Sequence, residues 1–114
     1  MSHDMDELMR RSDEIWEESI LPSLSDFIGI KALSPLFEPK WNELGELDAT
    51  IQLFCEWVDR QDIDGLNYSV HRIDNRSPVL LITIEGTGPG EVIFYSHLDK
   101  QPSKPELWSE GLGP

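Results

Sequence analysis

The chain has 114 residues, of which 39% are apolar, a composition that suits one modest globular domain and excludes a disordered chain. Its formal net charge of −13 argues against binding to nucleic acid or to an anionic membrane surface. The chain has no long apolar run, no signal-peptide pattern at its start and one cysteine, so we expect a cytoplasmic protein that does not enter the membrane.

Two stretches in the first half have apolar residues at intervals of three and four, which places them along one face of a helix. The first predicts a helix over residues 3–30. Pro22 should kink or divide it, because proline lacks an N–H group and crowds the carbonyl of Glu18. The second predicts a helix over residues 42–60, in which Cys55 lies on the apolar face and is interpreted as a packed thiol rather than a nucleophile.

The negative charge is concentrated in this helical part. Residues 1–66 hold 16 acidic and 5 basic side chains, a net charge of −11, whereas residues 67–114 hold 6 and 4. We interpret the acidic surface as a solvated helical face, with a docking surface for a basic partner as the alternative.

From residue 67 the pattern becomes that of strands. "YSVHRI" alternates polar and apolar residues, and "PVLLITIEG" and "EVIFYSH" are apolar runs bounded by the turn sequences "DNRSP" and "GTGPG". We predict strands over residues 67–73, 78–85 and 91–97, paired antiparallel because the connections are short. "GTGPG" has no following helix and no lysine, so it predicts a hairpin turn rather than a phosphate-binding loop.

These elements predict an α/β fold of two amino-terminal helices followed by three β-strands. Two helices cover one face of such a sheet, and little of the chain remains to cover the other face or the sheet edges. We therefore expect residues 1–114 to be an incomplete part of a larger domain, with a protein partner as one way to cover the exposed sheet.

The last predicted strand ends in His97 and Asp99, two residues apart. Residues at this spacing in an extended segment point to the same side, so the imidazole and the carboxylate converge. A neutral imidazole binds metal ions, and a neighbouring carboxylate orients the ring. Two alternatives are that His97 acts as a general base held by Asp99, or that both residues serve structure alone. One imidazole falls short of the three or four protein ligands that zinc takes.

Other candidate residues carry weaker signals. His3 and His71 have no partner at ligand spacing and are interpreted as solvated or structural. Ser96 directly precedes His97, but adjacent strand residues face opposite ways, so the two are not expected to act as a nucleophile and its base.

The segment "VIFYSHLDKQPSKPELWSEGLGP" resembles the first metal-binding segment of the dizinc exopeptidase and amidohydrolase family. That family includes glutamate carboxypeptidase, carnosinase-like dipeptidases, aminoacylase and succinyl-diaminopimelate desuccinylase. The shared pattern is an apolar strand, a small residue, H-x-D, a short tail ending in proline and a later tryptophan, here Val92–Tyr95, Ser96, His97, Asp99, Pro102 and Trp108. The family has glycine at the position of Ser96, and the "HLDKQP" form is most similar to the carnosinase-like branch.

The resemblance implies a three-layer α/β/α domain that hydrolyses dipeptides or N-acyl amino acids. His97 would be a ligand to one of two zinc ions, and Asp99 would be the active-site carboxylate that orients it. The family's other ligands, its catalytic glutamate and its dimerisation domain follow the H-x-D segment, and no acid in residues 1–114 matches them. We therefore expect an amino-terminal fragment of a zinc metallopeptidase that is inactive by itself, with a non-catalytic acidic interaction or regulatory module as the alternative.

Overall fold

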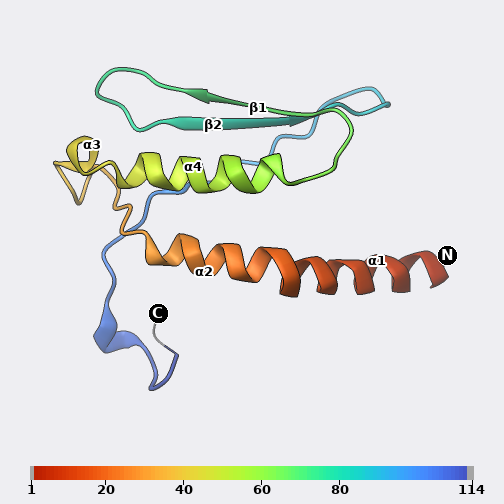
Figure 1. Cartoon of the computed structure of the whole chain (residues 1–114), viewed down its shortest axis with the longest axis horizontal. Helices are drawn as coiled ribbons and strands as arrows, with labels where there is room; N and C mark the ends of the chain where they lie inside the picture. The colour runs from red at the N-terminus through yellow and green to blue at the C-terminus, as the bar shows by residue number, and fades with distance from the viewer. Residues whose placement is uncertain (1, 113–114) are drawn as a thin grey trace. The chain divides into compact units, whose positions relative to one another are not determined.

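The computed structural model describes residues 2–112, and it combines helices with a two-stranded antiparallel sheet (Figure 1). The chain is therefore of mixed α and β composition, in agreement with the coarse prediction. It divides into two compact units, one up to Gly29 and the other from Ile30. Among the described residues, no helix is both long and apolar enough to cross a membrane.

The first unit is a single helical segment with an irregular turn in its middle. Helix α1 (Ser2–Ile15) is followed by a π-helical turn (Trp16–Ile20) and by α2 (Leu21–Gly29). The N–H of Leu21 donates to the carbonyl of Trp16, five residues back, which is the π-helical pattern. Pro22 has no N–H to offer the carbonyl of Glu18, so the wide turn lies where α-helical bonding is interrupted. The proline thus divides the helix without ending it.

The second unit begins its regular structure with α3 (Trp41–Leu44) and α4 (Glu46–Asp59). The sequence predicts one helix over residues 42–60, but Gly45 separates these two helices with a φ of 68°. A left-handed residue of this kind ends a helix at low steric cost when it is glycine. The apolar residues keep their helical spacing across Gly45, so periodicity alone does not predict the break between α3 and α4.

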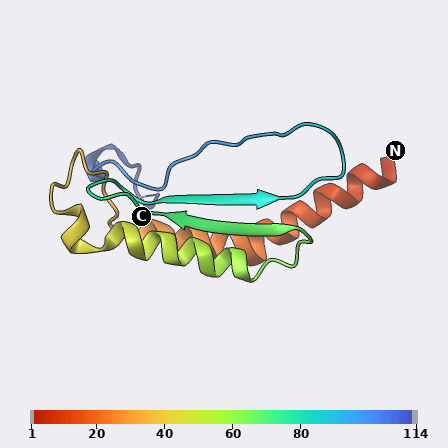
Figure 2. The ribbon, with the colours of Figure 1, turned by 90° about the horizontal axis from the view of Figure 1, so that it is seen from above.

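The sheet pairs β1 (Leu66–His71) with β2 (Val79–Ile84), in a register that joins Leu66 to Ile84 and His71 to Val79. Helix α4 lies beside this hairpin and runs opposite to β1 (Figures 1 and 2). Polar side-chain contacts join the helix and the hairpin. The Tyr68 hydroxyl donates to Asp59 Oδ1 at 3.0 Å, and Arg72 forms an ion pair with Asp48 near the other end of the helix.

The core of the second unit lies on one face of α4. Its buried side chains are Ala32, Leu47, Thr50, Ile51 and Val58. Thr50 is fully buried, and its hydroxyl donates to the Glu46 carbonyl at 2.9 Å, which satisfies the polar atom within the helix. Cys55 is half-buried. Its burial, and to a smaller extent the negative charge of the nearby Asp59, raise the pKa of its thiol. The thiolate is therefore disfavoured, which suits a packed thiol.

The predicted third strand does not form. Residues 91–97 follow β2 as a connection outside the sheet, and Val92, Ile93, Phe94 and Tyr95 are 81% to 93% exposed. Continuous apolar runs form strands when both faces of a sheet are covered. In the second unit α4 covers one face of the hairpin, so a third strand of this composition would gain little burial.

Candidate metal-ligating site

The segment that carries His97 and Asp99 is held in place by the next residue, Lys100. Leu33 and Lys100 form an isolated parallel bridge, in which the Lys100 N–H donates to the Ala32 carbonyl at 2.8 Å and the Ser34 N–H donates to the Lys100 carbonyl at 2.9 Å. The bridge ties the residue that follows Asp99 to the first residues of the second unit.

The Lys100 side chain reinforces this attachment. Its ammonium group donates to the carbonyl of Ile30. Burial lowers the pKa of Lys100, and the negative charge of Glu46 partly opposes that effect. A part-buried ammonium that donates to a backbone carbonyl is not left as an unpaired donor, so the contact favours one conformation of the segment.

His97 is oriented by Asp99 through one ring nitrogen. His97 Nδ1 lies 3.0 Å from Asp99 Oδ1 and 2.9 Å from the Asp99 backbone oxygen. Both oxygens are acceptors, so Nδ1 carries the proton in the neutral ring and Nε2 presents a lone pair. The His97 side chain is 70% exposed and that of Asp99 is 30% exposed. The ring can therefore offer Nε2 to a metal ion or to a proton while Asp99 fixes its tautomer.

The pair stands apart from other candidate ligands. Within residues 2–112, no three His, Cys, Asp or Glu side chains are grouped closely enough to hold a metal ion. His71 lies on β1, where its Nε2 is 2.8 Å from the Ser69 hydroxyl. The side chain of His3 lies outside the part of the chain that the structure describes. Ser96 is exposed, and Asp99 rather than Ser96 contacts the imidazole.

Sequence reasoning missed an open hollow beside the amino-terminal end of α4. It has a volume of about 410 Å³, and Arg72 and Asp48 form an ion pair in its wall. The remaining lining residues are Trp41, Asn42, Ile73, Asp74, Asn75, Arg76 and Pro78. No local sequence motif predicts this hollow, because it depends on how the hairpin turn packs against α3 and α4. His97 and Asp99 do not line it.

Comparison with models of known protein families finds none that matches this chain, and comparison with curated protein sequences also finds no match.

Proposed function

We propose that residues 92–102 are the first metal-binding segment of a zinc-dependent peptidase or amidohydrolase that cleaves dipeptides or N-acyl amino acids. The observation that carries the proposal is the contact between Asp99 and His97 Nδ1, which leaves Nε2 available on an exposed ring. Zinc-binding histidines typically donate their second ring N–H to a carboxylate or carbonyl oxygen in this way. The order of apolar segment, H-x-D and proline supports the same assignment.

In this proposal His97 Nε2 is one ligand of a zinc ion, and Asp99 fixes the ring and increases its basicity. Zinc, when bound, supplies a water of lowered pKa for attack on an amide carbonyl. The other ligands and the proton acceptor come from outside residues 2–112, because zinc needs three or more protein ligands and the described residues group no such set. We expect no hydrolysis of a dipeptide by residues 1–114 alone.

The test is a nitrogen-15 NMR measurement of the imidazole nitrogens during titration with zinc. We expect His97 to be the Nδ1–H tautomer before zinc is added, and Nε2 to be the nitrogen whose resonance moves as zinc binds. Asp99→Asn should weaken the zinc effect at His97 by about 10- to 100-fold, the usual consequence of removing an orienting partner.

His71 provides the matched control, because it is also exposed and bonded to a residue two positions away. His71→Ala should leave the zinc effect at His97 unchanged, and His97→Ala should remove specific binding. If zinc moved the His71 and His97 resonances equally, the metal would be responding to the general negative charge of the chain and the proposal would fail.

The alternative function is a non-catalytic acidic interaction module. It is favoured by the exposed apolar side chains of the described residues, which include Val92–Tyr95 and much of β2. A catalytic role predicts that zinc affects His97, whereas an interaction module predicts binding to another protein that is indifferent to the His97→Ala substitution.

A further inference from the structure

Helix α1 presents a row of exposed large apolar side chains, which we call the α1 stripe. The row begins with Met5, Leu8 and Met9, whose intervals of three and one place them on the same side of a helix. It continues with Ile15 and with Trp16, the first residue of the π-helical turn, and the exposed fractions of the five side chains lie between 41% and 60%. An apolar row of this length on an exposed helix marks an interaction surface.

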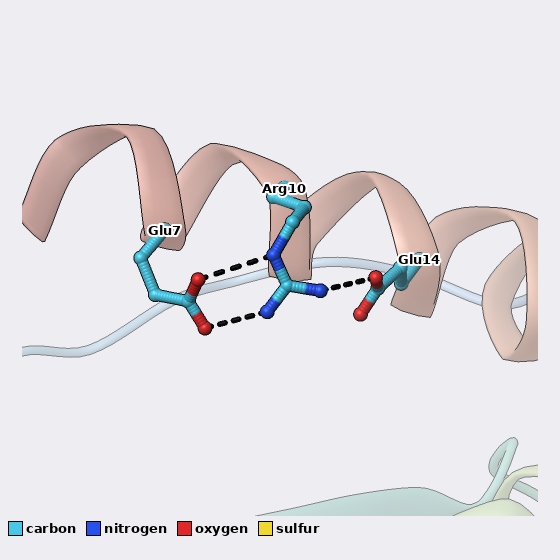
Figure 3. Close-up of polar contacts among 3 residues, drawn as sticks. All are labelled: Glu7, Arg10 and Glu14. Carbon is cyan, nitrogen blue, oxygen red and sulfur yellow. Dashed lines mark hydrogen bonds and ion pairs between the residues drawn. The ribbon is translucent and has the colours of Figure 1, made fainter. Parts of the chain in front are cut away.

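On the opposite side of α1, charged side chains of the helix pair with one another. Arg10 lies between Glu7 and Glu14, donating two hydrogen bonds to Glu7 and one to Glu14 (Figure 3). The hydrogen bond to Glu7, which has the largest effect, and the contact with Glu14 raise the pKa of the Arg10 guanidinium. Asp6 and Asp13, one heptad apart, lie instead beside the stripe on the side of Met9. The stripe therefore has an acidic border that Arg10 does not neutralise.

The charge of the whole chain restricts what can cover the α1 stripe. Residues 1–29 hold eight acidic and two basic side chains, a net charge of −6, and residues 30–114 hold fourteen and seven, a net charge of −7. A second copy of the chain would bring further negative charge to the acidic border, and the second unit of the same chain is acidic as well. Charge complementarity is met by a basic occupant.

We propose that the α1 stripe is a docking site for a basic amphipathic helix of another protein. Its apolar face would cover Met5, Leu8 and Met9, with lysine or arginine side chains placed beside Asp6 and Asp13. Methionine side chains are flexible and adapt to partners of varied shape. Helix-on-helix recognition of this kind uses apolar anchors at intervals of three and four. This inference uses no part of the metal site and stands apart from the proposed function.

The experiment measures binding of a synthetic peptide to the whole chain by fluorescence anisotropy. The probe is a labelled helical peptide with leucine on one face and lysine on the other, and its counterpart has glutamate in place of lysine. We expect the basic peptide to bind and the acidic peptide not to bind. The double variant Leu8→Gln with Met9→Gln should weaken binding by about tenfold or more, because two apolar contacts are lost while the charge and helix propensity are kept.

Two variants of equal charge separate local recognition from general attraction. Asp6→Asn with Asp13→Asn removes the acidic border, and Glu7→Gln with Glu14→Gln removes the same charge from the opposite side of α1. At physiological ionic strength charges are screened over about 8 Å, so the border variant should weaken binding several-fold more than the other. Circular dichroism measures the helix content of each variant.

Three outcomes would overturn the proposal. The first is equal weakening by the two charge variants, which would mean attraction to the net charge alone. The second is binding of the acidic peptide as tightly as the basic one. The third is a dimer in sedimentation equilibrium that the Leu8→Gln and Met9→Gln variant dissociates, which would make a second copy the occupant.

Discussion

Tyr68 is the residue whose hydroxyl connects the sheet to α4. The hydrogen bond that it donates to Asp59, together with partial burial and the charge of Asp59, raises the pKa of the phenol above its ordinary value of 10.0. The unfolded chain loses this proton at lower pH than the folded chain does. The contribution of Tyr68 to stability is therefore fully present below pH 10.0 and declines as the pH rises through the folded-state value.

Tyr68→Phe is expected to lower the free energy of unfolding at neutral pH and to flatten its decline above pH 10.0. The measurement is urea denaturation over a series of alkaline pH values. Tyr95→Phe is the matched control, because Tyr95 is 91% exposed and should leave both quantities unchanged. The Cys55 thiol, whose pKa is also raised, interacts with the Tyr68 hydroxyl, so both variants are compared in a Cys55→Ala background that removes the alkaline loss of the thiol. Equal pH profiles for the two phenylalanine variants would contradict the role of Asp59.

At the scale of elements, the start of the hairpin depends on Gly65. This glycine has a φ of 76°, and a Cβ placed on it would lie 3.2 Å from Glu85 Cβ and 3.3 Å from the Glu85 nitrogen. The Gly65 carbonyl accepts a hydrogen bond from the same Glu85 N–H at 3.2 Å. The residue before β1 and the residue after β2 therefore approach each other closely, at a conformation that other residues rarely adopt.

Gly65→Ala should lower the free energy of unfolding by about 1–2 kcal/mol or more, since a left-handed conformation and a close backbone contact are both penalised. Thermal and urea denaturation would measure the loss. Gly86→Ala is the control, because Gly86 lies just beyond the hairpin, has no positive φ, and a Cβ there would meet no atom within 4 Å. A Gly65→Ala variant as stable as the Gly86→Ala variant would show that the end of the hairpin is open in solution.

The elements differ in how far the sequence predicts them. Local periodicity locates the long first helix, α4 and the two paired strands, since these patterns depend on neighbouring residues. The continuous apolar run over residues 91–97 predicts a strand, but such a run forms one only where other elements bury both faces of the sheet, and the run itself does not specify those elements. At the site, the two-residue spacing of His97 and Asp99 predicts that they converge. The attachment of Lys100 to Ala32 and Ser34 joins distant segments, so no local pattern predicts it.

At the scale of the whole molecule, the buried core is small for the length of the chain. Ala32 and four residues of α4 are the buried side chains among the described residues, while the apolar segment Val92–Tyr95 is almost entirely exposed. Stability of the chain should therefore depend on α4 and hardly at all on the segment that leads to His97. Any longer protein or partner that covers the segment would reverse that dependence, because each covered apolar side chain contributes to the free energy of unfolding.

A pair of truncations tests this distribution. Ile51 is 6% exposed, so Ile51→Ala should lower the free energy of unfolding by about 2–5 kcal/mol. Phe94 is 93% exposed, so Phe94→Ser should change it by less than about 0.5 kcal/mol in residues 1–114. Urea denaturation of both variants gives the comparison. A loss for Phe94→Ser close to that for Ile51→Ala would mean that the segment is buried in solution, as in the three-stranded sheet that the apolar pattern predicts. If the loss appeared only when the basic peptide or zinc was present, the ligand itself would order the segment before His97.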